Sequence, residues 1–275
     1  MLNAILNVGP SYDTSGLVGF PINVLFVHLM QNQNGRALFG DRLVNEALKD
    51  VLNDYGKMVL TNTSLTYMND KNPHGWFSPK AKKKIDYSIY QCDPSQPHYG
   101  FKNWNEWFLR EFKHGERVLG AGSPANVDED DIVVNACEAT PIAAPMQPTK
   151  KVKASAPFWL KGNLYSLVDI FGDYGNEKGY GGLFVGGTVL QAFLSSLSYH
   201  HWHAPVSGQI VDIYTLPGTY YLGQSQFHVK HDPSPPDMSQ SFISHTAARM
   251  IYVIKADNPR LGYVGLVFIG IFVTI

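Results

Sequence analysis

The sequence predicts an α+β protein in which a helical N-terminal region, residues 1–120, is followed by a mostly β domain, residues 121–275. Apolar residues recur at helical spacing between Gly40 and Leu60, whereas beyond residue 131 short apolar runs alternate with Gly, Pro and Asp. The loop from Gly120 to Asp131 separates these two patterns. We expect the second domain to be sandwich-like or barrel-like, and to be incomplete at its C-terminus.

Helices are expected in three places in the N-terminal region. Between Gly40 and Leu60 the apolar side chains fall on one helical face, and Asp41 is placed to cap the first turn. A second segment, from Asn103 to Phe112, carries aromatic residues on one side and is interpreted as a core helix. The apolar stretch from Gly16 to Met30 contains Pro21 and falls short of the roughly 20 residues of a membrane span, so a buried helix is expected.

Short strands are expected throughout the second domain, with one short helix from Tyr165 to Phe171 among them. The predicted strands are Ile132–Asn135, Phe158–Leu160, Leu183–Val185, Val189–Leu194, Gln209–Tyr214, Met250–Ile254 and Val264–Phe272. The final apolar run, Tyr263 to Ile275, is rich in β-branched and aromatic residues and is too short for a membrane span. We therefore interpret it as a central strand buried on both faces rather than as a tail anchor.

Composition and charge narrow the range of functions. The chain of 275 residues carries 22 basic and 23 acidic residues, so no nucleic-acid partner and no electrostatic attraction to anionic lipid are expected. Its two cysteines, Cys92 and Cys137, lack metal-binding spacing and favour a reducing compartment. No basic residue precedes Arg36, which argues against a secretory signal or an Arg-rich transit peptide. A cytoplasmic location is expected.

The most informative motif is the run from Tyr199 to Gly208, because His200, His201 and His203 stand just before a turn into the predicted strand Gln209–Tyr214. Histidine titrates near neutrality, and every buried imidazole requires a hydrogen-bond partner. Such a cluster favours acid–base catalysis over a purely structural role. The sequence contains no Gly-x-Ser-x-Gly elbow, no dinucleotide-binding fingerprint and no phosphate-binding loop.

A metal site is an alternative for the same residues. On a strand, His201 and His203 would share one face, as in the His-x-His pairs of double-stranded β-helix metal enzymes. Those enzymes use a carboxylate shortly after the pair, but here no Glu follows Glu177, and the next Asp is Asp212 on the next predicted strand. We therefore expect no bound metal, with a metal-dependent β-domain enzyme as the alternative.

Further motifs accompany the histidines along nearly the whole chain. They are Gly100-Phe101-x-x-Trp104-x-x-Trp107-Phe108-x-Arg110, Asn135-Ala136-Cys137-Glu138, Phe158-Trp159-Leu160-Lys161-Gly162, Phe184-Val185-Gly186-Gly187-Thr188, Tyr199-His200-x-Trp202-His203-x-Pro205-Val206-x-Gly208, Pro217-Gly218-Thr219-Tyr220 and Ala256-Asp257-Asn258-Pro259-x-Leu261-Gly262. In these motifs the chain resembles the phosphatidylserine decarboxylase family, most closely its fungal branch of tryptophan decarboxylase-like proteins. The resemblance implies a helical accessory region followed by a β-rich catalytic domain.

The resemblance also implies a carboxy-lyase that is made as a proenzyme. In this family a serine hydroxyl attacks the preceding carbonyl of a Gly-Ser bond, and self-cleavage leaves a covalent pyruvoyl group on the new N-terminus. That group serves as electron sink while carbon dioxide leaves an amino-acid or phosphatidylserine substrate. By position, His203 resembles the base that activates the serine, and His200 the residue associated with decarboxylation and reprotonation. Glu138 stands where many members have the Asp that orients the histidine, and His201 where they usually have Arg.

The same resemblance places the self-cleaving Gly-Ser one or two strands beyond Leu266–Ile275, and this sequence stops before it. Its Gly-Ser pair, Gly122-Ser123, has no flanking match and is interpreted as a turn. We therefore expect a truncated member that lacks its C-terminal segment or small subunit, forms no pyruvoyl group and is inactive as it stands. The sequence does not decide whether the chain forms a homo-oligomer. A non-catalytic remnant of the family that acts as a binding protein is the alternative to an enzyme. The absence of a convincing membrane anchor favours a soluble amino acid such as tryptophan over phosphatidylserine.

Overall fold

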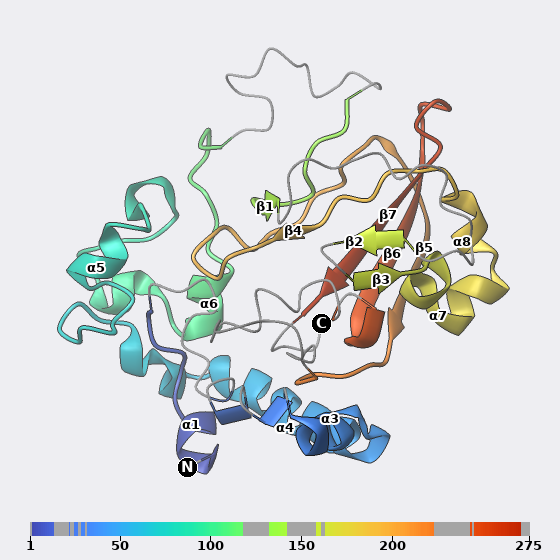
Figure 1. The fold of residues 1–275 in the computed structure, drawn as a ribbon. Helices are drawn as coiled ribbons and strands as arrows, with labels where there is room; N and C mark the ends of the chain where they lie inside the picture. Colours follow the sequence, from blue (N-terminus) through green and yellow to red (C-terminus); the bar gives the residue numbers. More distant parts are fainter. Residues whose placement is uncertain are drawn as a thin grey trace. The chain divides into compact units, whose positions relative to one another are not determined.

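The computed structural model describes residues 2–13, 22, 25–26, 29–30, 32–117, 132–141, 158–160, 163–222, 243 and 245–270. Helices and small sheets are both present, which confirms the α+β class, and none of the sheets formed by the described strands closes into a barrel (Figure 1). The expected loop Gly120–Asp131 and the Gly122-Ser123 turn lie outside the described residues, as does most of the apolar stretch Gly16–Met30. Within the described ranges, no helix combines the length and the apolar character that crossing a bilayer requires.

The helices lie mainly in the first half of the chain and the strands in the second. The α-helices are α1 (Leu2–Leu6), α3 (Gln33–Gly40), α4 (Arg42–Val59), α5 (Pro79–Lys82), α6 (Trp104–Phe108), α7 (Leu167–Glu177) and α8 (Tyr180–Leu183), with 3-10 turns at Asn62–Tyr67, Tyr87–Ile89 and Pro97–Gly100. The strands are β1 (Thr140–Pro141), β2 (Phe158–Leu160), β3 (Asn163–Tyr165), β4 (Ala192–Phe193), β5 (Gly208–Leu216), β6 (Arg249–Ala256) and β7 (Tyr263–Ile269).

The chain forms two compact units, and each is assembled from separated segments. The first unit contains residues 1–22, 51–140 and 193–206, and the second contains residues 23–50, 141–192 and 207–275. The domain boundary expected after residue 120 stays a prediction.

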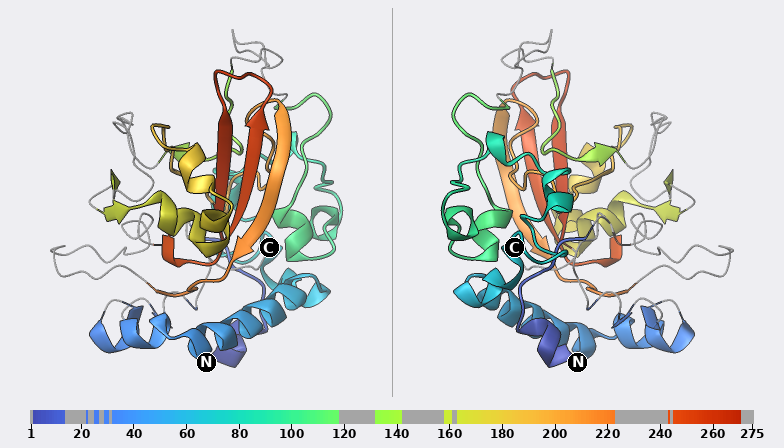
Figure 2. Two further views of the ribbon diagram at one scale, coloured as in Figure 1. Left: turned by 90° about the vertical axis from the view of Figure 1, so that its right-hand side faces the viewer. Right: turned by 90° about the vertical axis from the view of Figure 1, so that its left-hand side faces the viewer.

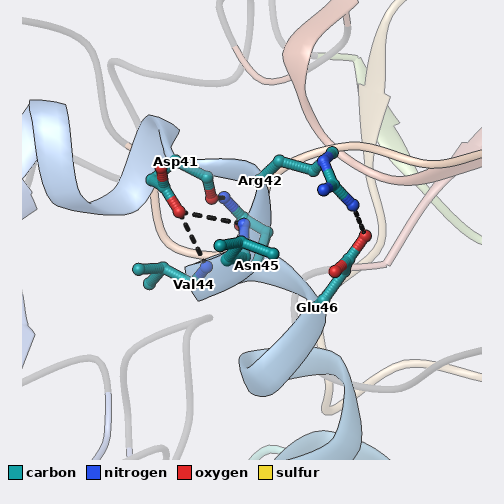
Figure 3. A network of polar contacts seen from close by, with 6 residues as sticks. Asp41, Arg42, Val44, Asn45 and Glu46 are labelled. Carbon is teal, nitrogen blue, oxygen red and sulfur yellow. Dashed lines mark hydrogen bonds and ion pairs between the residues drawn. The ribbon is translucent and has the colours of Figure 1, made fainter.

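The long helix α4 confirms the helix expected from apolar spacing, and Asp41 fixes where it begins. The Asp41 carboxylate accepts hydrogen bonds from the backbone N–H groups of Leu43 at 2.9 Å and Val44 at 3.0 Å (Figure 3). These two N–H groups have no partner inside the helix, so the cap satisfies donors that would otherwise need water. Arg42 and Glu46, one turn apart on the same exposed face, form an ion pair.

Aromatic rings dominate the core of the first unit. Trp76 is fully buried, its ring centroid lies 4.0 Å from that of Trp107, and its indole N–H donates to the Pro10 carbonyl at 2.7 Å. The indole N–H of Trp107 donates to the hydroxyl of Tyr87 at 3.2 Å, and that hydroxyl donates to the Trp76 carbonyl at 2.7 Å. Buried Tyr and Trp need such partners for their polar atoms, so this network fixes α6 against residues 76–87.

The aromatic helix expected from Asn103 to Phe112 is present as α6 but ends at Phe108. The Asn103 side chain caps its start by accepting a hydrogen bond from the Glu106 N–H at 2.8 Å. Leu109 follows with φ −93° and ψ 31°, outside helical geometry. The helix therefore stops one residue before Leu109, and the chain leaves it there.

The main sheet of the second unit has the order β5-β6-β7, and all of its pairs are antiparallel (Figure 2). β6 is the central strand, and its Ile251 and Val253 are fully buried. The residues of β7 are only partly buried. The interpretation of the C-terminal run as a central strand was therefore wrong for the described sheet, where β7 pairs with β6 alone and residues 271–275 lie outside the description. An apolar run predicts that a strand is buried, but it does not predict whether the strand lies at the centre or at the edge of its sheet.

Three of the other predicted strands are confirmed, and one is wrong. The strands at Phe158–Leu160, Gln209–Tyr214 and Met250–Ile254 are confirmed as β2, β5 and β6, and the short helix is confirmed as α7. The expected strand at Leu183–Val185 is wrong, because this stretch forms the end of α8 and a turn. Glycines in left-handed geometry, Gly179 with φ 75° and Gly186 with φ 82°, bracket it and favour turns over extension.

The remaining two strand predictions also exceed what the structure contains. Residues 132–135 have no strand structure, and the segment expected from Val189 to Leu194 is reduced to the two residues of β4. Short apolar runs without clear alternation are the weakest strand signals, because a loop next to a core can carry the same residues.

The central position of Ile251 gives a stability prediction. We expect Ile251→Ala to lower the free energy of unfolding by about 2–5 kcal/mol, because it leaves a cavity at a fully buried position. Ile213→Ala, on β5 at a residue that is 47 % exposed, should cost under about 1 kcal/mol. Urea unfolding followed by circular dichroism measures both, and equal losses would contradict the assignment of β6 as the core strand.

Candidate active site

The histidine segment is an irregular stretch that leads through a turn at residues 205–207 into β5, as the sequence predicts. It lies beside residues 134–138. The N–H of His203 donates to the Ala136 carbonyl at 2.9 Å, and the N–H of Val134 donates to the Pro205 carbonyl at 3.0 Å. The two segments therefore run antiparallel, which brings Glu138 alongside the histidines.

The Glu138 side chain holds the backbone of the histidine segment. One carboxylate oxygen accepts the Tyr199 N–H at 3.1 Å, and the other forms an ion pair with Arg117 at 2.6 Å. Both partners of the ion pair are substantially exposed, so the pair itself contributes little to stability. Among the described contacts, Glu138 bonds to the residue before His200 and not to an imidazole. Its predicted role of orienting a histidine directly stays a prediction.

His200 is partly buried, with its ring centroid 3.9 Å from that of Phe108. Its Nδ1 lies 3.1 Å from the Ser198 carbonyl oxygen. Because a carbonyl oxygen can only accept, Nδ1 carries the proton, and the neutral ring keeps a lone pair on Nε2. Burial lowers the pKa of His200 from 6.5 to about 4, helped by the charges of Arg110 and His201 and opposed by the Ser198 hydrogen bond. At neutral pH the ring is therefore uncharged.

His203 has a buried Nε2 with no hydrogen-bond partner among the described residues. An unpaired buried nitrogen costs roughly 1–3 kcal/mol, so native proteins rarely leave one without a reason. This atom is therefore a candidate contact for a group that the chain does not supply from its described part.

His201 has different surroundings. Its Nε2 lies 3.1 Å from the Leu109 carbonyl, and its ring stacks on Tyr199 with centroids 4.6 Å apart. The described part of the chain contains no group of three or more His, Cys, Asp or Glu side chains placed to hold a metal ion. His201 and His203 thus share no ligand geometry with a described carboxylate.

Cys137, directly before Glu138, is buried, and burial raises the pKa of its thiol to about 11. The Glu138 charge acts in the same direction, and a hydrogen bond from Ala139 opposes it. The thiol stays protonated at neutral pH, so Cys137 is not an activated nucleophile.

Sequence reasoning missed the role of Arg110, which entered only as part of a motif. Arg110 is 1 % exposed, and its Nη2 donates to the carbonyls of Leu197 at 2.6 Å and Ser198 at 3.0 Å. Its guanidinium lies over the rings of Tyr90 and Trp107. The signal that could have found it is the nearby Trp107, because an arginine close to a tryptophan in the sequence can place its guanidinium over the ring.

The low pKa of His200 predicts a pH dependence of stability. Because the folded state resists protonation while the unfolded state accepts it, the stabilisation is fully present above pH 6.5 and is lost as the pH falls towards 4. The loss should approach ~3 kcal/mol at ~1.4 kcal/mol per pKa unit. Urea unfolding at several pH values should show that His200→Gln flattens this dependence, and an unchanged slope in the variant would contradict the burial of a neutral ring.

Comparisons with known proteins show which family the chain resembles. Residues 1–85 and residues 104–274 match two family models, both described as phosphatidylserine decarboxylase. Decarboxylase iboD of Amanita muscaria is 32 % identical over 270 residues, which cover 92 % of this chain and 73 % of the relative. L-tryptophan decarboxylase of Psilocybe cubensis is 29 % identical over 288 residues, covering 98 % of this chain and 63 % of the relative.

A more distant relative carries the family name itself. Phosphatidylserine decarboxylase proenzyme 3 of Schizosaccharomyces pombe is 25 % identical over 245 residues, covering 87 % of this chain and 22 % of that protein. The chain thus spans less than two thirds of the length of the Psilocybe and Schizosaccharomyces relatives. By the extent of these matches, the chain belongs to the phosphatidylserine decarboxylase family, a family of carboxy-lyases, and within it to the fungal tryptophan decarboxylase-like branch.

Proposed function

We propose that this chain is the histidine-bearing part of a pyruvoyl-dependent amino-acid decarboxylase. The observation that carries the proposal is the buried, unpartnered Nε2 of His203. In a self-cleaving proenzyme a serine hydroxyl must give up its proton before its oxygen can attack the neighbouring carbonyl. An imidazole nitrogen that no described donor or acceptor occupies is suited to receive that proton.

His200 and Glu138 have separate tasks in this proposal. His200 is neutral at pH 7, and its Nε2 lone pair can accept a proton and return it to the substrate carbon. Glu138 keeps the segment in place by accepting the N–H of Tyr199. The pyruvoyl group supplies the electron sink for the electrons of the breaking bond to carbon dioxide. The pair of histidines fits such a group, because one ring has an unpartnered nitrogen and the other has a free basic nitrogen.

An aromatic amino acid such as L-tryptophan is the substrate we propose. The match to the L-tryptophan decarboxylase of Psilocybe cubensis runs through 98 % of this chain, more than the match to the phosphatidylserine decarboxylase proenzyme. The partner in this proposal is the family's serine-containing C-terminal segment, present as part of one proenzyme or as a small subunit. The two free thiols, Cys92 and Cys137, favour the reducing cytoplasm as the place of action.

Self-processing tests the assignment of His203. We expect this chain, extended with the Gly-Ser-containing C-terminal segment of a fungal relative, to cleave itself into two polypeptides that intact mass spectrometry detects. His203→Ala should slow this cleavage by about 100-fold or more, because the serine loses its base. His74→Ala, at an exposed histidine, is the matched control and should cleave like the parent.

The outcomes separate the alternatives. Cleavage of His203→Ala at the parental rate would refute the base assignment. A parent that folds but never cleaves would favour the non-catalytic binding protein instead. Stoichiometric zinc or iron retained after dialysis would favour the metal-dependent enzyme.

The substrate is tested with the processed protein. We expect release of the amine from L-tryptophan, followed by mass spectrometry, to exceed conversion of phosphatidylserine in vesicles by about tenfold or more at equal substrate concentration. The reverse preference would contradict an amino-acid substrate while leaving the decarboxylase assignment in place.

A further inference from the structure

Two donors meet on the carbonyl oxygen of Ser198. Arg110 Nη2 lies 3.0 Å from it, and Nδ1 of His200 lies 3.1 Å from it. The same Nη2 atom also holds the carbonyl of Leu197 at 2.6 Å. A carbonyl oxygen has two lone pairs, so both acceptor positions of Ser198 are filled.

Arg110 is itself held from several sides. Its guanidinium carbon lies 4.5 Å from the ring centroid of Tyr90 and 4.7 Å from that of Trp107. Its Nη1 donates to the Trp107 carbonyl at 3.3 Å. A planar guanidinium between aromatic rings loses little further freedom when it forms hydrogen bonds, and a lysine ammonium cannot reproduce this fork.

The chemistry of these groups determines which nitrogen of His200 is free. A guanidinium can only donate, so it fixes the direction of the Ser198 carbonyl. The remaining lone pair of that carbonyl then accepts only from a protonated Nδ1, which leaves Nε2 as the basic nitrogen. The charge of Arg110 also disfavours an imidazolium at His200.

We propose that Arg110 is a positioning residue that sets the orientation and the tautomer of His200 through the carbonyl of Ser198. The catalytic benefit rests on the function proposed above, but the tautomer itself does not. Other charged or titratable groups near His200 are His201 and Tyr199 on its own segment, and Glu138 from the adjacent segment. Of these, none forms a hydrogen bond to the Ser198 carbonyl in the described part of the chain.

Nitrogen NMR of ring-labelled histidine in the unprocessed chain tests the proposal. At pH 7 the His200 signals, assigned by their loss in His200→Gln, should show a neutral ring with the proton on Nδ1. Arg110→Met should release the carbonyl and raise the population with the proton on Nε2 by about fivefold or more. Arg110→Lys, which keeps the charge but loses the fork, should give the same direction of change. Arg42→Met, at an exposed arginine, is the matched control and should leave the His200 signals unchanged.

A proton on Nε2 in the unsubstituted chain would refute the proposal, whether or not any variant folds. An unchanged Nδ1–H tautomer in folded Arg110→Met, or in folded Arg110→Lys if the Met variant does not fold, would refute it as well. In the processed protein, Arg110→Lys should lower kcat by about tenfold with little change in KM. A protein that releases no amine but shows the tautomer change would contradict the proposed function alone.

Discussion

The histidine segment depends on the hydrogen bonds that the buried guanidinium of Arg110 donates to it. The guanidinium packs over two aromatic rings. It also donates hydrogen bonds to the backbone carbonyls of Leu197 and Ser198, which have no partner in a helix or strand. A buried charge without partners costs several kcal/mol, so the charge and the turn at residues 195–198 constrain each other. The carbonyls of the turn are the acceptors that allow the Arg110 cation to be buried. The same hydrogen bonds hold the turn in place.

The aromatic core of the first unit gives this arrangement its rigidity. Trp107 packs against Trp76 with its ring tilted, donates a hydrogen bond to the hydroxyl of Tyr87 and also lies beneath the guanidinium of Arg110. Directional polar contacts inside an apolar core permit few alternative packings. A loop with no secondary structure of its own can present two imidazoles in fixed positions because the elements beneath it are fixed, which is how scaffolds commonly present chemistry.

Local patterns were enough to predict α4 and β5, because the Asp41 cap and the short apolar run after the turn at Pro205–Gly208 act over a few residues. The histidine motif identified the family, and the position of the motif ahead of β5 is confirmed. The position of β7 at the edge of the sheet that the described strands form could not be predicted, because strand order depends on which segments meet in space. Arg110 was missed for the same reason, since the carbonyls that give it a role lie 87 and 88 residues further along the chain.

These separations have a consequence for how the protein reaches its folded state. The contacts that define the histidine segment join residues 61 apart at Glu138 and Tyr199, and 92 apart at His201 and Leu109. Each such contact requires a large loop to close before its energy is gained, and topologies of this kind fold slowly. The first unit also draws on three stretches of chain, which are separated in the sequence by segments of the second unit. The histidine segment therefore takes up its folded geometry only when stretches that lie far apart in the sequence have met.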